Sequence, residues 1–168
     1  IPIAKELLKQ YPEAGSWEEN DEVSNYYALT SVWPAEKAID EAHSQGAFIF
    51  WNHSWWTPQS PQGISILTDF HKKLISENKL HGIEIVNGVN YSDEAFQIAI
   101  DNNLTIIGTS DVHNLIDWDY SFYKGKHRPV TLVLSKDKTE KSIKDALFKG
   151  RTVVWFKNKL IGLKDNLV

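Results

Sequence analysis

Apolar and polar positions follow two different periods along most of the chain. Four segments place apolar residues three or four positions apart, which predicts amphipathic helices. Five shorter runs are apolar almost throughout, which is typical of strands buried on both faces. The predicted helices cover residues 35–46, 64–79, 92–103 and 139–150, and the predicted strands cover residues 47–53, 82–88, 104–110, 130–135 and 152–156.

Residues at the segment ends support these boundaries. Pro34 suits the first turn of the first helix, Ser92 is a favourable N-cap followed by two acidic residues, and Gly150 ends the last helix. Strands and helices alternate with short connections, which predicts an α/β fold of parallel βα units. Such units either close into a barrel or open into a doubly wound sheet, and both place their sites at the carboxyl ends of strands.

The first 33 residues are less regular. Residues 13–25 have the composition of an exposed acidic loop, and residues 26–33 are a candidate strand. The sequence contains no Met and begins with a helical pattern, so we expect further chain before Ile1. Because no linker or low-complexity tract divides the sequence, we expect residues 1–168 to form one domain.

Composition narrows the classes of function. The 168 residues carry a net charge of −4 without a cluster of Lys or Arg, which gives no electrostatic reason to expect nucleic acid or a membrane surface. The chain has no Cys, which excludes disulfides, thiolate catalysis and Cys-ligated zinc. We expect a soluble protein, and the composition leaves open whether it is exported to a periplasm or cytoplasmic.

Side chains that can ligate metals follow the predicted strands. His53 ends one strand, and Asp111 and His113 follow another within "GTSDVHN". If the strand continued, residues two apart would face the same side. A carboxylate and an imidazole there would suit a metal, a proton-transfer pair or a buried salt bridge, and the residues alone leave these alternatives open. Neutral imidazole and carboxylate are the usual ligands of Zn, Mn and Fe.

Other polar and aromatic residues are secondary candidates. Glu84 lies mid-strand between two isoleucines, where an unpaired charge would be costly, and we expect it to pair with a Lys rather than face the site. Trp55 and Trp56 can form a rigid wall of a substrate pocket. His127 and Arg128 suit contact with an anionic substrate. Three further histidines are expected at the surface, namely His43, His71 and His81.

Three segments resemble the polymerase-and-histidinol-phosphatase (PHP) family, namely "FIFWNHSWW", "HGIEIVNG" and "LTIIGTSDVHN". The likeness extends over about residues 34–163, and the order of the segments is similar to a bacterial subgroup of metal-dependent phosphodiesterases. It implies part of a distorted (β/α)7 TIM-like barrel with two or three divalent metal ions (Zn, Mn or Fe) at its carboxyl face. His53 matches the family's strand-end His, and Asp111 and His113 match its Asp-x-His motif.

The chain also departs from the family pattern. No His-x-His motif is present, Ser54 replaces the usual Pro, and Asn25 or Tyr26 falls where a ligand His belongs. The chain therefore resembles the C-terminal part of a PHP domain that lacks its N-terminal strands and first metal motifs.

The resemblance implies a metal-dependent phosphoesterase, a phosphodiesterase rather than a monoesterase, which hydrolyses a small-molecule phosphoester with a metal-bound hydroxide. His53, Asp111 and His113 would then be catalytic metal ligands, with Trp55, Trp56, His127 and Arg128 binding substrate. The alternative is a catalytically incomplete PHP-like remnant that serves as a metal-binding or structural module.

Overall fold

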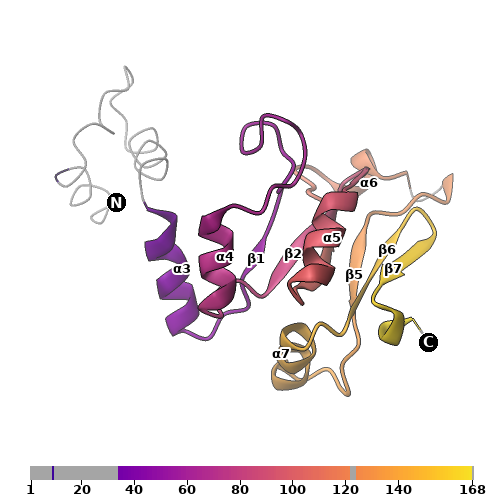
Figure 1. The fold of residues 1–168 in the computed structure, drawn as a ribbon. Coiled ribbons are helices and arrows are strands. Elements are labelled where there is room, and N and C mark those ends of the chain that lie inside the picture. The colour runs from indigo at the N-terminus through magenta and orange to yellow at the C-terminus, as the bar shows by residue number, and fades with distance from the viewer. Residues whose placement is uncertain (1–8, 10–33, 122–123, 168) are drawn as a thin grey trace. The chain divides into compact units, whose positions relative to one another are not determined.

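The structure is a computed structural model that describes residue 9, residues 34–121 and residues 124–167 (Figure 1). The predictions for residues 13–25 and 26–33, including Asn25 and Tyr26, lie outside the described residues. The chain divides into two compact units between Gln45 and Gly46. In the first unit, helix α3 spans Ala35–Ser44, close to the predicted 35–46.

A small parallel sheet forms the centre of the second unit. Strand β2 (Gly82–Asn87) lies between β1 (Phe50–Trp51) and β4 (Thr105–Thr109) and is parallel to both. The short strand β3 (Asn90–Tyr91) pairs antiparallel with the end of β2. The parallel arrangement predicted for these three strands is confirmed, although the strand predicted over 47–53 contracts to two residues.

Two helices connect these strands. Helix α4 spans Asp69–Ser76 and α5 spans Asp93–Asp101. The Ser92 hydroxyl accepts the Ala95 N–H at 3.1 Å, which confirms the predicted N-cap. The predicted start of α4 at residue 64 is too early, because Thr68 is the N-cap and its N–H donates to His71 Nδ1 at 3.3 Å.

The C-terminal part of the chain forms a second sheet of three strands. Strands β5 (Val130–Val133), β6 (Thr152–Phe156) and β7 (Lys159–Gly162) pair antiparallel, and helix α7 (Glu140–Phe148) connects β5 to β6. The expectation of parallel βα units is therefore wrong for this region. The Leu134 N–H donates to the Arg151 carbonyl at 2.9 Å, so the connection containing α7 begins and ends at the same end of the sheet.

Strand β4 contacts the second sheet through small and β-branched residues. Thr131 Oγ1 donates to the Gly108 carbonyl and accepts the Gly108 N–H, both at 2.9 Å. Thr152 Oγ1 donates to the Ile106 carbonyl at 2.7 Å. The hydrophobic core spans both sheets and α5, and its buried members are Ile83, Ile85, Val86, Ala95, Ala99, Leu104, Ile106, Val154 and Phe156.

The fold is mixed α/β, as predicted, and its sheets are small. Within residues 46–121 and 124–167 these sheets do not close into a barrel. Two short helices, α6 (Ile116–Asp119) and the 3-10 helix η3 (Lys164–Asn166), lie in segments without a predicted element. No helix in the described parts of the chain is both long and apolar enough to cross a membrane.

Candidate functional site

Two candidate site residues adopt an uncommon backbone conformation. His53 follows β1 with φ of 53°, and Asp111 follows β4 with φ of 49°. Residues other than Gly rarely occupy this left-handed region, and such strain concentrates at functional sites. Because β1 and β4 flank β2 in one parallel sheet, both residues lie at the same edge, where α/β folds form their sites.

Glu84 lies between them on β2 and is completely buried. Its Oε2 accepts the His53 backbone N–H at 2.6 Å and lies 3.0 Å from His53 Nδ1. Its Oε1 accepts the Thr109 hydroxyl and the Asn87 amide, the latter at 3.3 Å. These donors compensate the carboxylate for lost hydration. The predicted pairing of Glu84 with a Lys is wrong.

The hydrogen bonds of Glu84 define the tautomer of His53. A carboxylate only accepts hydrogen bonds, so the proton of the neutral ring belongs on Nδ1, which donates to Glu84. Asn87 Nδ2 also lies 3.0 Å from His53 Nδ1, but two donors cannot bond to each other, and we assign the Asn87 donor to Glu84 Oε1. The lone pair of His53 Nε2 then remains available. Carboxylates hold metal-binding histidines in this way.

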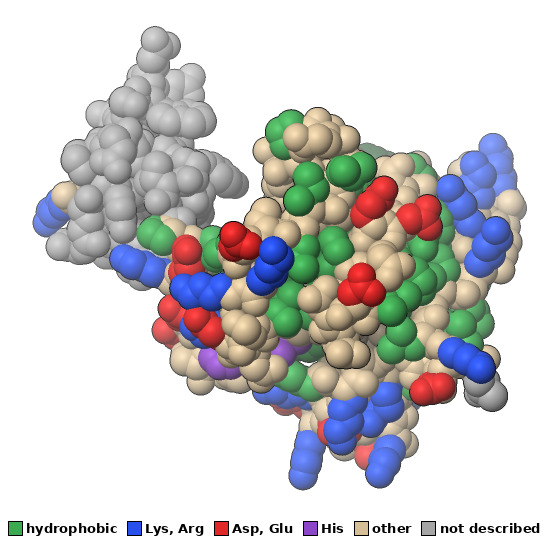
Figure 2. All heavy atoms as spheres, viewed as in Figure 1, with side chains coloured by type: hydrophobic (Ala, Val, Ile, Leu, Met, Phe, Trp, Pro, Cys, Tyr) green, Lys and Arg blue, Asp and Glu red, His purple; other side chains and the backbone are tan. Residues whose placement is uncertain are grey.

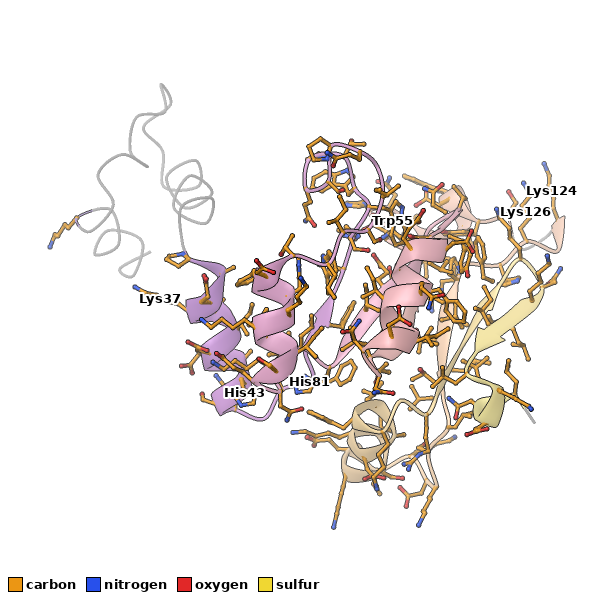
Figure 3. The ribbon with its side chains drawn as sticks, viewed as in Figure 1. Lys37, His43, Trp55, His81, Lys124 and Lys126 are labelled. Carbon is orange, nitrogen blue, oxygen red and sulfur yellow. The ribbon has the colours of Figure 1, made fainter. Side chains whose placement is uncertain are left out.

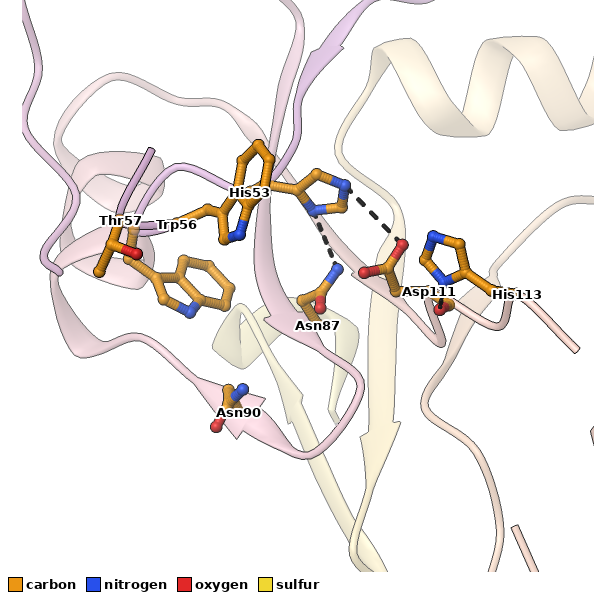
Figure 4. Close-up of a pocket in the computed structure, with 8 residues that line it drawn as sticks. His53, Trp56, Thr57, Asn87, Asn90, Asp111 and His113 are labelled. Carbon is orange, nitrogen blue, oxygen red and sulfur yellow. Dashed lines mark hydrogen bonds and ion pairs between the residues drawn. The ribbon is translucent and has the colours of Figure 1, made fainter. Parts of the chain in front are cut away.

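The available nitrogen of His53 faces Asp111. His53 Nε2 lies 3.8 Å from Asp111 Oδ1 (Figure 4). Two donors on one tetrahedral ion, each about 2.1 Å from it, are about 3.4 Å apart. The observed separation exceeds this value by about 0.4 Å, so the pair fits a divalent metal in donor type and nearly in spacing.

His113 lies in the loop after β4 beside Asp111. Strand β4 ends at Thr109, so the predicted strand to residue 110 is too long and the two residues are not strand neighbours. Instead, His113 Nδ1 donates to the Asp111 carbonyl oxygen at 2.8 Å (Figure 4). Over the described part of the chain, no three His, Asp or Glu side chains are close enough together to hold a metal ion. The ligand roles of His53, Asp111 and His113 therefore stay predictions.

Tyr120 is hydrogen-bonded to the segment that precedes Asp111. Its hydroxyl donates to the Ser110 carbonyl at 3.1 Å. Burial raises the pKa of the Tyr120 phenol, and the carboxylates of Asp119 and Asp111 raise it further. The phenol therefore stays protonated and keeps its donor role at neutral pH.

A cavity of about 480 Å³ opens in front of these residues. His53, Asp111 and His113 lie along one side of it, and Trp56, Thr57 and Asn90 along the other (Figure 4). Trp55 and Asn87 also line it, and none of the lining residues that the structure describes is Lys or Arg. Both tryptophans line the cavity, and their binding of substrate stays a prediction. Thr57 and Asn90 carried no sequence signal that we used.

The other predicted substrate-binding residues, His127 and Arg128, do not line this cavity. The His127 ring stacks on Trp155 with centroids 3.8 Å apart, and its Nε2 accepts the Asn158 N–H at 3.1 Å. Lys124 and Lys126 project from the same loop away from Trp55 (Figure 3). Further basic side chains gather around α7 (Figure 2). A substrate role for His127 and Arg128 stays a prediction.

For Glu84 and His81, the structure differs from what the sequence predicted. Sequence reasoning did not place Glu84 beside His53, and the available signal was a charged residue inside a strand of buried apolar neighbours. The prediction that His81 is a surface residue is wrong. His81 is buried, accepts the Ile49 N–H on Nδ1 at 3.0 Å and packs edge-on against Phe148.

Comparison with models of known protein families and with curated proteins finds no match. Among solved structures, the fold matches a two-domain protein from Bacteroides vulgatus ATCC 8482 that contains a predicted PHP-like metal-dependent phosphoesterase. The TM-score is 0.76 and the sequence identity 44%. The match covers 80% of this chain and 39% of that protein's chain, so the two are similar over well under half of the longer one.

Proposed function

Because the chain is a relative of a predicted PHP-like metal-dependent phosphoesterase, we propose that it contributes to a metal-dependent phosphoesterase site, and that the ester is a phosphodiester. The observation that carries this proposal is the approach of His53 Nε2 to within 3.8 Å of Asp111 Oδ1, with Glu84 bonded to the other ring nitrogen. An imidazole donor whose other ring nitrogen donates to a carboxylate is typical of metal sites.

His53 through Nε2 and Asp111 through its carboxylate would hold one divalent ion, with His113 as the third donor. A bound ion of this kind acts as a Lewis acid on the phosphoryl oxygens. Glu84 keeps the proton on His53 Nδ1 and keeps Nε2 turned toward Asp111. The same carboxylate binds the His53 N–H, and so supports the left-handed backbone that aims the ring.

The charge of the cavity favours a diester over a monoester. A phosphate monoester carries close to two negative charges at neutral pH, because its second pKa is about 6, whereas a diester carries one. Among the described residues, the cavity lining includes no Lys or Arg, and Asp111 adds a negative charge. A singly charged diester therefore needs less compensation here than a monoester does.

We also assign the parallel strands β1, β2 and β4, within residues 46–121, to part of a distorted (β/α)7 barrel. The support is the run of three parallel strands β1, β2 and β4, with the candidate donors at one edge of the sheet. In this arrangement the described residues supply only some of the ligands of a larger metal cluster.

Metal binding and turnover test the proposal together. The chain and the whole protein would be titrated with Mn²⁺ and Zn²⁺ by calorimetry and then assayed with bis-p-nitrophenyl phosphate. We expect metal binding that His53→Ala abolishes, and hydrolysis by the whole protein that a chelator stops. Absence of metal-dependent turnover of any phosphoester by the whole protein would reject the proposal. The matched control for the metal titration is His127→Ala, whose ring lies outside the cavity.

A second candidate is a catalytically incomplete PHP-like module that binds a single metal weakly or serves a structural role. The observation in its favour is that the described residues bring no group of three metal-binding side chains together. The calorimetric titration separates the two candidates. Two or more tight sites per chain would exclude the incomplete module.

A further inference from the structure

The two indoles in the segment after His53 both line the cavity but differ in exposure. Trp55 packs against the hydrophobic core, whereas Trp56 is 54% exposed. The Trp56 ring stands edge-on to the His53 ring, with centroids 6.4 Å apart and an interplanar angle of 71°. A large apolar ring left exposed beside polar groups is a frequent mark of a binding surface.

Hydrogen bonds hold Trp56 in this place. The backbone N–H of Trp56 donates to the His53 carbonyl at 2.9 Å, and the Trp56 backbone carbonyl accepts the backbone N–H groups of Gln59 and Ser60 at 2.8 and 2.7 Å. At the base of the segment, the buried hydroxyls of Ser54 and Ser65 lie 2.7 Å apart. The exposed indole therefore projects from a hydrogen-bonded turn.

The polar groups on this side of the cavity are neutral. Thr57 and Asn90 lie beside Trp56, opposite His53 and Asp111 (Figure 4). The Asn90 side chain is exposed and lines the cavity, so its amide can hydrogen-bond to a ligand. A flat apolar face next to an uncharged amide suits a neutral ring that carries polar groups on its edge.

We propose that Trp56 and Asn90 form a subsite for the neutral, ring-bearing group of the ester, next to the His53–Asp111 pair. This proposal rests on the proposed function only in placing the phosphoryl group at that pair. The volume of about 480 Å³ exceeds what a phosphoryl group with methyl substituents fills, and lies in the range of sites for larger ligands. Trp56 then determines which esters bind.

The test compares two singly charged diesters that differ in one group, methyl phenyl phosphate and dimethyl phosphate. Each is titrated into the 168-residue chain with Zn²⁺ present, because this ion is diamagnetic, and binding is followed by NMR at the indole N–H of Trp56, which is identified by its loss in Trp56→Ala. We expect the phenyl ester to bind about tenfold more tightly, because contact between two aromatic rings strengthens binding by up to about that factor. The preference should fall below about threefold in Trp56→Ala.

Trp118→Ala is the matched control, because Trp118 is 73% exposed on α6 and does not line the cavity. Trp56→Leu repeats the test with a side chain that keeps apolar bulk but lacks the flat ring, should the alanine variant not fold. Equal affinities for the two diesters, no binding of either, or a preference that survives in both Trp56 variants would overturn the proposal.

Hydrolysis measured in the same samples separates this subsite from the proposed function. Aromatic preference without turnover by the whole protein would reject the phosphoesterase and leave the subsite. Turnover without aromatic preference would reject the subsite alone.

Discussion

One oxygen of Glu84 contacts His53 twice: Oε2 accepts the backbone N–H at 2.6 Å and the ring Nδ1–H at 3.0 Å. The carboxylate thereby holds both the backbone and the imidazole of a residue with left-handed φ. Glu84 is fully buried, while His53 lines the cavity. A buried charge on the central strand thus determines how a candidate ligand is presented at the surface.

Replacing Glu84 with Gln tests this relationship. We expect metal affinity to fall by about 10- to 100-fold, the usual effect of removing such a supporting group. The free energy of unfolding of the variant should also fall by about 1–3 kcal/mol. The side-chain NH₂ group of Gln would replace one carboxylate oxygen, and so put a donor where Glu84 has an acceptor near the His53 N–H. Calorimetry measures the affinity, and the ¹⁵N shifts of His53 report its tautomer. The control is Glu140→Gln, because Glu140 is exposed on α7. An unchanged tautomer of His53 together with an unchanged metal affinity would contradict the prediction.

Asp111→Asn should weaken metal binding at least tenfold, because an amide is a poor ligand for Zn or Mn compared with a carboxylate. Asn tolerates the left-handed conformation that Asp111 adopts. The free energy of unfolding should therefore change by less than about 0.5 kcal/mol. Calorimetry and urea unfolding check both parts, with Asp117→Asn on α6 as control. A loss of stability as large as the loss of affinity would instead indicate a structural role.

His113→Ala distinguishes a third metal donor from a residue that only supports its loop. His113 lines the cavity but its Nδ1 bonds to the Asp111 carbonyl. We expect metal affinity to fall at least tenfold, since catalytic zinc sites commonly need three protein ligands. The readout is a calorimetric titration beside His127→Ala. Equal affinities in the two variants would remove His113 from the ligand set.

Gly108→Ala tests the contact between β4 and the second sheet. A Cβ at position 108 would lie 2.4 Å from Val154 Cγ1, which is closer than atoms in proteins approach. We expect a loss of about 1–3 kcal/mol in the free energy of unfolding, measured in urea. Val154→Ala removes the clashing methyl groups, so the double variant should be more stable than the sum of the two single losses implies. If the two losses in unfolding free energy were strictly additive, Gly108 and Val154 would not be in contact.

Asp145 makes a pH-dependent contribution to stability. Hydrogen bonds from Lys149 and Arg151 lower the pKa of its carboxyl from 3.8 to about 2. Because the folded pKa lies below the unfolded one, the stabilisation is present above about pH 4 and is lost as the pH falls toward 2. Melting temperatures of the protein and of Asp145→Asn should therefore differ at pH 6 and converge near pH 2. A difference that persists at pH 2 would assign the effect to packing.

The sequence by itself determined the elements that depend on local chemistry. The Ser92 N-cap and the apolar period placed α5, and the buried apolar runs placed β2 and β4 within a residue or two. The general rule that parallel strands end at one edge also brought His53 and Asp111 to the same cavity. The resemblance to the PHP family, carried by the same segments, is confirmed by the match to a solved structure.

Only the tertiary structure decided what depends on pairing between distant residues. Glu84 and His53 are 31 positions apart, and no local pattern distinguishes this partner from a Lys. The register of β2 against β4 shifts between Glu84 and Val86, and this bulge allows Asn87 to bond to Glu84 from three positions along the strand. The antiparallel direction of β5 and β6 likewise depends on where the chain after α7 pairs. Short-range period and capping act within a few residues, whereas register, strand direction and the partner of a buried charge are properties of the assembled sheet.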